Sequence, residues 1–452
     1  SSEACGGLFC NGVFLQPVQQ NAERILFEPH DNGTISTTVE ITYAGEPQDF
    51  SWVVPVPDTP SLGVVDPGTL LSLDGATAPS IVPPPFSCTQ PPSPMAPFGA
   101  MASSDISFPN EAVAPTSDVD VEDIPQVGPY DPTVVSSEDP AALINWLNDN
   151  DYLITPEMEP AVAHYVQAGM KFLAMKLAPE AETSQIAPLR MTYPGTDPMV
   201  PIVLTGVGAE PEMGILVFIA GDSRYESSNF TNLEVDIDTV HAHPTNGQNN
   251  YYPLVSQQLD GVQGRGVVVE HVEGSPTVAS FVANGNAGNP PRPDLAVREG
   301  KNSRYLARVL DRNTVITRLY TRMSPWEMDG DPRFQPVDGP LKGNVFDLSD
   351  RPTIELCDDS ATMDFNPVPC GSTYCGLDAQ CATTETGIDG CVCPEGEVVR
   401  SITAPTLAGA LAPAPTCQPL AYDMLRSVYQ EDTDSSSTSP ECAAVDCGEG
   451  GE

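Results

Sequence analysis

Lys and Arg are scarce in this 452-residue sequence. They number 19, only four of them Lys, against 62 Asp and Glu, and the formal net charge is −43. Residues 25–170 contain no Lys or Arg but 21 Asp and Glu. Because nucleic-acid phosphates would be repelled by such a surface, we expect no nucleic-acid partner.

Long apolar runs are missing as well. The longest strongly apolar run is residues 213–220, whereas a membrane-spanning helix needs about 20 such residues. We therefore expect no membrane span in this chain. Its first residue is Ser rather than Met, which indicates either a trimmed chain or a secreted one whose signal peptide has been removed.

Common catalytic motifs are also absent. The sequence has no Gly-x-Ser-x-Gly elbow, no phosphate-binding P-loop and no His-Glu-x-x-His helix. Gly206-Val207-Gly208 lacks the third glycine of a dinucleotide site. Each cysteine has a candidate bridge partner, which leaves no spare thiol as a nucleophile. We therefore do not expect an enzyme.

Cysteine, by contrast, is concentrated near the C-terminus. An even number of cysteines, most of them in the last 100 residues, predicts disulfides and an oxidising compartment. We expect an extracellular or cell-surface protein. The twelve cysteines are Cys5, Cys10, Cys88, Cys357, Cys370, Cys375, Cys381, Cys391, Cys393, Cys417, Cys442 and Cys447.

The charges are unevenly distributed along the chain. Residues 265–333 carry ten basic and eight acidic side chains, behind the acidic first half. One interpretation is adaptation to a salty medium, in which solvated carboxylates keep the protein soluble. The other is that the acidic half contacts the basic segment of a neighbouring copy, a heterologous contact that propagates into rings or fibres.

Four arginines are the interaction residues that the second interpretation requires: Arg304, Arg308, Arg318 and Arg322. For Arg318 and Arg322 an intramolecular alternative stays open. If their segment is a strand, both side chains lie on one face and can pair with Asp329 or Glu327.

The N-terminal third is organised around residues 48–57, its most apolar segment. A run of Phe, Trp and Val between Gly- and Pro-containing ends predicts a buried strand. Residues 35–43 alternate apolar and polar side chains, so we predict that the two segments form an antiparallel pair. A further strand is expected within residues 15–27.

The region around residues 118–356 has a mixed α and β pattern. Asp139 can cap a helix that runs to residue 150, with Pro140 at its first position. Further helices are predicted at 157–168, 252–259, 277–282 and 303–311, and strands at 171–178, 189–193, 200–206, 213–220, 267–271 and 316–322. The main domain thus comprises a β-rich part (1–82), a Pro-rich linker or surface loop (83–117) and this mixed part.

A separate small module is expected at residues 357–420. The spacing Cys370-x4-Cys375-x5-Cys381-x9-Cys391-x-Cys393, followed by Cys417, resembles the epidermal-growth-factor-like (EGF-like) family. The resemblance implies the pairs Cys370–Cys381, Cys375–Cys391 and Cys393–Cys417. The last gap is longer than is usual for the family. Residues 421–452 form an acidic, Ser- and Gly-rich tail.

A second resemblance covers about residues 5–350. The segments that carry it are Cys5-Gly6-Gly7, Asp49-Phe50-Ser51-Trp52-Val53-Val54-Pro55-Val56-Pro57, Gly128-Pro129-Tyr130-Asp131, Tyr193-Pro194-Gly195 with Pro201-Ile202, and Thr317-Arg318-Leu319-Tyr320-Thr321-Arg322-Met323-Ser324-Pro325 followed by Met328 and Asp331-Pro332. In these segments the chain resembles a bacterial family, domain of unknown function 2330. The resemblance implies secretion and no particular activity.

Two sets of side chains are candidate metal ligands. Acidic clusters at Asp118, Asp120 and Glu122 and at Asp236 and Asp238 place like charges close together, which a bound Ca²⁺ would neutralise. A zinc site would combine His241 and His243, on one face of a strand, with Glu270 and His271. Solvated acids and surface histidines are the competing interpretations. The sequence firmly implies no cofactor, and Ca²⁺ is the candidate that the acidic clusters offer.

These observations predict an α+β protein with a large N-terminal region of mixed sheet and helix and a small disulfide-rich C-terminal module. We expect a secreted or cell-surface structural or interaction protein that self-assembles into a fibre or layer. Its partners would be copies of itself or other cell-surface proteins. The alternatives are a calcium-dependent adhesion protein and a secreted metal-dependent hydrolase.

Overall fold

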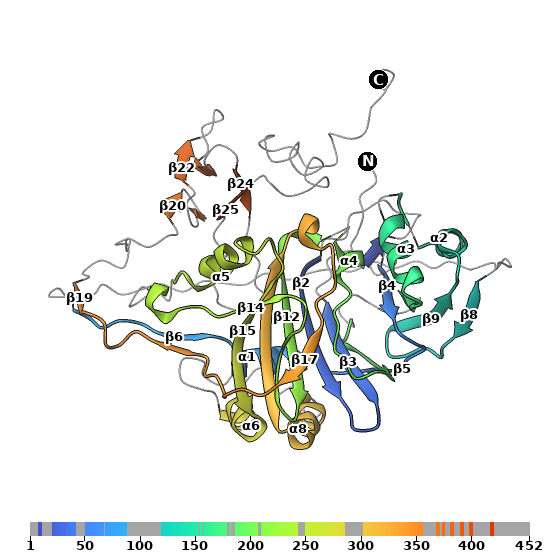
Figure 1. The fold of residues 1–452 in the computed structure, drawn as a ribbon, viewed down its shortest axis with the longest axis horizontal. Coiled ribbons are helices and arrows are strands. Elements are labelled where there is room, and N and C mark those ends of the chain that lie inside the picture. The colour runs from blue at the N-terminus through green and yellow to red at the C-terminus, as the bar shows by residue number, and fades with distance from the viewer. Residues whose placement is uncertain are drawn as a thin grey trace.

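The computed structural model describes residues 8–10, 20–41, 50–66, 68–87, 119–152, 154–156, 158–178, 181, 186–206, 209–242, 249–284 and 302–355, and short strands between residues 368 and 419. Two sheets and the helices packed on them make up most of this part (Figure 1). The predicted α+β class is therefore confirmed for the N-terminal region. No helix of the described residues is long and apolar enough to cross a membrane.

The larger sheet has eight strands. Their order is β14 (Thr231–Leu233), β15 (Gly266–Gly274), β16 (Val315–Met323), β12 (Ala209–Gly221), β2 (Gln20–Pro29), β3 (Thr34–Ile41), β11 (Leu189–Pro194) and β5 (Ser61–Val64). The pair β12–β2 is parallel, and the pairs on either side of it, β16–β12 and β2–β3, are antiparallel. The sheet is thus mixed.

Four helices pack on one face of this sheet: α1 (Thr69–Thr77), α5 (Tyr251–Asp260), α6 (Ser275–Asn284) and α8 (Asn302–Arg312). Their apolar side chains form one cluster with Leu26 of β2 and with Leu216 and Phe218 of β12. We call this the helix-side cluster.

The smaller sheet has five strands, in the order β1 (Leu8–Cys10), β4 (Phe50–Val56), β10 (Lys171–Leu177), β9 (Tyr130–Ser136) and β8 (Asp120–Asp123). Its outer face contacts α2 (Pro140–Asp149), α3 (Glu159–Gln167) and the short α4 (Ile202–Thr205). The Asp139 carboxylate accepts a hydrogen bond from the Ala141 amide and Pro140 follows it, so the predicted helix start is confirmed.

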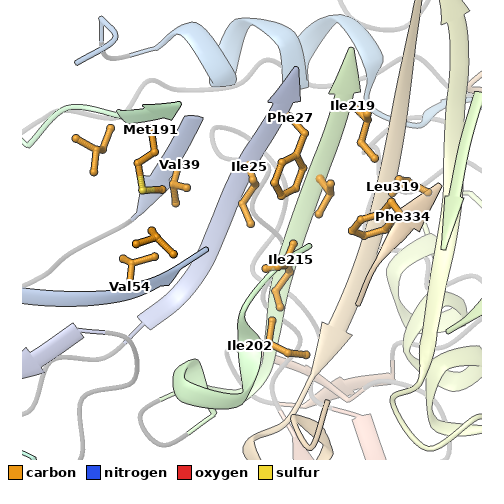
Figure 2. Packing of buried hydrophobic residues seen from close by; sticks show 14 of the residues in the cluster. Ile25, Phe27, Val39, Val54, Met191, Ile202, Ile215, Ile219, Leu319 and Phe334 are labelled. Atoms are coloured by element: carbon orange, nitrogen blue, oxygen red, sulfur yellow. The ribbon is translucent and has the colours of Figure 1, made fainter. Parts of the chain in front are cut away.

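The inner faces of the two sheets enclose the largest hydrophobic cluster, which we call the inter-sheet cluster. Ile25 and Phe27 of β2, Ile215 of β12 and Leu319 of β16 point into it (Figure 2), and Trp52 and Val54 of β4 meet them from the smaller sheet. Because side chains alternate along a strand, Val53 of β4 lies in the outer cluster with α2 and α3.

Short strand pairs complete the described chain. They are β13 (Arg224–Ser227) with β17 (Phe334–Val337), β6 (Ser80–Val82) with β18 (Val345–Asp347), β7 (Phe86–Ser87) with β19 (Ile354–Glu355), β20 (Val368–Cys370) with β21 (Thr373–Cys375), β22 (Gln380–Thr383) with β23 (Asp389–Val392), and β24 (Glu397–Arg400) with β25 (Thr416–Pro419). Residues 86–87, predicted to lie in a linker, are thus paired with a strand from the far end of the main domain. Most of the predicted linker, residues 88–117, lies outside the described residues.

Two sequence predictions are wrong. The segments 35–43 and 48–57 do not pair, because β3 lies between β2 and β11 in the larger sheet whereas β4 lies between β1 and β10 in the smaller one. Residues 200–206 contain α4 rather than a strand. A carboxylate oxygen of Asp331 accepts the Val203 amide, which stabilises the first turn of this helix.

Candidate functional site

Alternation along β2 places a carboxyl group between the two sheets. Ile25 and Phe27 belong to the inter-sheet cluster, and Leu26 belongs to the helix-side cluster. Glu23 is two residues before Ile25, so its side chain points toward the inter-sheet cluster. Its register partners are Ile41 on β3 and Ile215 on β12, which leaves it beside apolar residues on the sheet.

A pocket of about 290 Å³ opens at this place. Its floor comes from β2 and β3, and its opposite wall from Trp52, Val54 and the residues that follow on β4. Met170, Met191 and Leu204 complete the apolar lining. Its rim includes the exposed residues 194–197, at and after the end of β11, and the exposed Arg333.

Glu23 is the buried acid of this pocket. Its side chain is 8 % exposed, and among the described residues its carboxyl has no hydrogen-bond or ion-pair partner. Burial raises the pKa of Glu23 to about 7. A buried carboxyl in a pocket, with a pKa near neutrality, is a typical mark of a functional site.

The other polar side chains in the described lining are Thr37, Tyr193, Thr196, Asp197, Thr205 and Arg333. The Tyr193 hydroxyl lies 2.7 Å from Oγ1 of Thr37, and burial raises the pKa of Tyr193. Asp197 and Arg333 are exposed. The pocket therefore combines an apolar interior, one buried acid and a charged rim, the composition expected of a small-molecule binding site.

Sequence analysis missed this site. The one available signal was the alternation Glu23, Ile25, Phe27, which puts an acid on an apolar strand face. The pocket wall on β4 could not be paired with it from the sequence, because the two strands belong to different sheets.

A second group of buried polar side chains lies on the opposite face of the larger sheet. Arg318 of β16 contacts Asp74 of α1 at 2.6 Å and Glu270 of β15 at 2.5 Å. Arg24 of β2 lies 3.3 Å from Asp74, and Tyr251 of α5 donates to Glu270. We call these five residues the buried charge network.

The network corrects the prediction that Arg318 and Arg322 form an interaction surface. They are 0 % and 1 % exposed, because the face of β16 that carries them is covered by helices. Arg318 pairs with Asp74 and Glu270 rather than with Asp329 or Glu327, and Nη1 of Arg322 donates to Ser256 at 2.8 Å. Burial disfavours the charged guanidinium, but Glu270 and Asp74 outweigh it and raise the pKa of Arg318. Arg304 and Arg308 are exposed on α8, and their role in an interaction stays a prediction.

The predicted calcium ligands are dispersed. Asp120 and Glu122 are exposed on β8, and Glu122 contacts Lys171 at 3.1 Å. Asp236 uses its carboxylate to cap the 3-10 helix Ile237–Thr239, accepting from the Asp238 amide. Asp118 lies outside the described residues. Within the described part of the chain, no three His, Cys, Asp or Glu side chains are grouped as metal ligands.

The predicted zinc ligands are separated in the same way. Both carboxylate oxygens of Glu270 are engaged, by Arg318 and Tyr251. His241 lies near Arg351, and partial burial and this cation lower the pKa of His241. His271 is buried, and burial followed by the charge of Arg318 lowers its pKa to about 4. His243 lies outside the described residues.

The disulfide predictions fall on parts of the chain whose side chains are not described. Cys10, Cys370, Cys375, Cys381, Cys391 and Cys417 lie in strands of which only the backbone is described, and Cys381 is opposite Cys391 in the pair β22–β23. Cys5, Cys88, Cys357, Cys393, Cys442 and Cys447 lie outside the described residues. The EGF-like resemblance and its pairings stay predictions.

Comparison with known proteins gives one relationship. No curated protein and no solved structure matches the chain. A family model described as "Uncharacterized protein conserved in bacteria (DUF2330)" matches residues 1–282, a range that contains β2, β3, β4 and most of the pocket. The chain therefore belongs to the bacterial DUF2330 family.

Proposed function

We propose that the protein is an extracellular or cell-surface binding protein that holds a small, largely apolar ligand between its two sheets. The observation that carries this proposal is the pocket of about 290 Å³, lined by apolar side chains of β2, β3 and β4 and containing the buried Glu23. Clustered cysteines support the oxidising compartment.

The physical reason for binding is the apolar surface left uncovered inside the pocket. Water in a pocket lined by Ile, Val, Met and Trp side chains has few hydrogen-bond partners. A ligand that replaces it removes apolar area from water and gains about 0.8 kcal/mol for each buried methylene group. The volume is close to the lower end of ordinary ligand pockets, so the expected ligand is small.

The chain contains a reporter for this event. Trp52 lines the pocket, whereas the other two tryptophans lie elsewhere: Trp146 belongs to α2, on the outer face of the smaller sheet, and Trp326 lies in the 3-10 helix that follows β16. Titration of the full chain with n-octanol should change the tryptophan emission and saturate. Trp52→Phe should remove most of the change.

A pocket-filling variant tests where the ligand binds. Val54→Phe adds volume inside the pocket, and we expect it to weaken n-octanol binding at least tenfold. Val121→Phe makes the same change on the exposed strand β8 and should leave binding unaltered. Equal binding by wild type and Val54→Phe, or no saturable binding to the folded wild type, would contradict the proposal.

Self-assembly is a second candidate, supported by one row of charges. Arg304, Arg308 and Arg312 follow each other at intervals of four on α8, so they lie on one side of the helix, and all three are exposed. The exposed acids of β8 lie on the other sheet (Figure 1). Two different surfaces that attract each other give a heterologous contact.

Sedimentation velocity at low and high salt tests this candidate. Species larger than a monomer should be present at low salt and dissociate as salt screens the charges. The double variant Arg304→Glu/Arg308→Glu should remain monomeric at both. Association that survives this charge reversal would argue against α8 as the contact.

A further inference from the structure

We propose that the ligand of the inter-sheet pocket carries a cationic amine, and that the carboxylate of Glu23 is its counter-ion inside the pocket. This inference rests on the proposed function and names the class of ligand for the same site. It follows from the position of Glu23, the residues around it and the placement of the remaining charges.

The first argument is the lack of compensation around Glu23. A carboxylate removed from water is costly unless it is paired, and buried acids in proteins are normally paired or hydrogen-bonded. The buried charge network on the other face of the same sheet follows this rule, since Arg318 lies between Asp74 and Glu270. Glu23 is also buried, with only 8 % of its surface exposed, yet it has no such partner among the described residues.

The second argument is that the open side of Glu23 is the pocket. On the sheet, its register partners are Ile41 and Ile215, neither of which can donate a hydrogen bond from its side chain. Among the described residues no donor reaches the Glu23 carboxyl from the sheet, so the pocket interior is the side from which a ligand can supply one. An ammonium group provides both the positive charge and up to three hydrogen-bond donors.

The third argument concerns the body of the ligand. Phe27, Trp52 and Tyr193 line the pocket with Met191 and Val39. Aromatic faces attract organic cations, and aliphatic and thioether groups accommodate a hydrocarbon chain. An apolar amine matches both features.

The remaining charges disfavour an anionic head at the same position. A carboxylate placed next to Glu23 would bring two like charges together in an apolar surrounding. Among the described residues that line the pocket, Arg333 is the one cation, and it is exposed at the rim, where it can be solvated. A neutral alcohol would fill the pocket but would leave the Glu23 carboxylate without a counter-ion.

The preference for an amine should depend on pH. Tyr193, Asp197 and Arg333 are the other titratable or charged side chains that line the pocket. Burial raises the pKa of Tyr193, so its hydroxyl stays neutral between pH 5.5 and 8.5. With a pKa of about 7, Glu23 is mostly protonated at the lower limit and mostly ionised at the upper one. Amine affinity should therefore fall from pH 8.5 to 5.5 by most of the advantage that the ionised carboxylate gives, about eightfold for a tenfold advantage.

The experiment compares three probes with the same hydrocarbon chain: n-octylamine, n-octanol and n-octanoate. Each is titrated into the full chain at pH 8.5, followed by Trp52 emission and by calorimetry. We expect n-octylamine to bind about tenfold more tightly than n-octanol, and n-octanoate to bind least. In Glu23→Gln the amine should lose this advantage while n-octanol binds as before. Glu138→Gln, the same change at an exposed position, should behave like the wild type.

The outcomes separate this inference from the proposed function. If n-octanol binds and n-octylamine has no advantage, or if n-octanoate binds best, the amine inference is overturned and the apolar pocket stands. If none of the probes binds to the folded wild type, the proposed function fails first. Should Glu23→Gln not fold, the pH series on the wild type decides, since an amine affinity that is constant between pH 5.5 and 8.5 would rule out Glu23 as the counter-ion.

Discussion

The guanidinium of Arg318 on β16 lies 2.6 Å from the carboxylate of Asp74 on α1, and 244 positions separate the two residues in the chain. Asp74 also contacts Arg24 of β2 through its second carboxylate oxygen. One buried carboxylate thus joins a helix to two strands of the larger sheet. These two strands, β16 and β2, are not neighbours, because β12 lies between them.

Asp74→Asn should therefore destabilise the protein strongly. The variant leaves Arg318, which is fully buried, with one carboxylate fewer, and it leaves Arg24 without its pair on α1. Removing one partner of a buried ion pair costs about 3–5 kcal/mol. Urea unfolding of wild type and variant measures this difference.

Asp58→Asn is the matched control for that experiment. Asp58 also forms an ion pair, with Lys171 at 3.0 Å, but its side chain is half exposed. Water and salt screen such a pair, so the free energy of unfolding should change little. Similar losses in the two variants would show that burial does not set the strength of the network.

The parts of the structure that could be predicted from the sequence are those that depend on a local pattern of side chains. Strands and helices with a clear local pattern were predicted near their observed positions, among them β4, β10, β12, β16, α2 and α5, because periodicity is a local property. The strand that β3 pairs with could not be predicted, because an alternating pattern identifies a strand but not its neighbour in the sheet. The segment that became α4 is rich in β-branched residues, and its helix depends on the distant Asp331.

The two sites were harder to predict for the same reason. In the segment around Arg318 and Arg322, alternation places both arginines on one face with Ile316 and Tyr320, which are buried. Sequence analysis placed both arginines on one face but did not identify that face as buried, because their acidic partners come from α1 and β15, far apart in the chain. The pocket likewise needs strands of two sheets, so a single segment contains only half of it.

The pKa of Glu23 predicts a pH effect on stability without any ligand. The ordinary value is 4.5 and burial raises it to about 7 in the folded protein, so the folded state binds more protons than the unfolded state between these values. Stability should then fall as pH rises from 4.5 to 7, by about 3 kcal/mol in total. Glu23→Gln lacks this loss, and the difference between the unfolding free energies of wild type and variant at pH 4.5 and 8 measures it. A constant difference would contradict the assigned burial of the carboxyl.

His271 should act in the opposite direction. Burial, with Arg318 nearby, lowers its pKa from 6.5 to about 4, so the unfolded state binds more protons between these values. Stability should therefore fall as pH drops from 6.5 to 4, again by about 3 kcal/mol. His271→Leu removes this titration, so relative to the variant the wild type should lose stability only on the acid side. Chemical unfolding of wild type and variant at pH 4 and 7 gives the difference between their free energies of unfolding at each pH. If the wild type loses no stability relative to the variant between pH 7 and pH 4, the imidazole is not buried in its neutral form.

The turn between α5 and β15 offers a test of packing at a single atom. Gly264 and Gly33 both have a left-handed backbone, with φ of +70° and +77°. A Cβ at Gly33 would meet nothing within 4 Å, whereas a Cβ at Gly264 would lie 2.6 Å from Cβ of Glu327. The Glu327 side chain cannot easily move aside, because it is buried and its carboxylate accepts a hydrogen bond from the Ser324 amide at 2.7 Å.

Gly33→Ala should cost about 1 kcal/mol from backbone strain alone. Gly264→Ala should cost that amount and a further 1–3 kcal/mol, roughly, from overpacking. Urea unfolding of both variants measures the two costs, and equal losses would mean that the loop moves away from Glu327 without resistance.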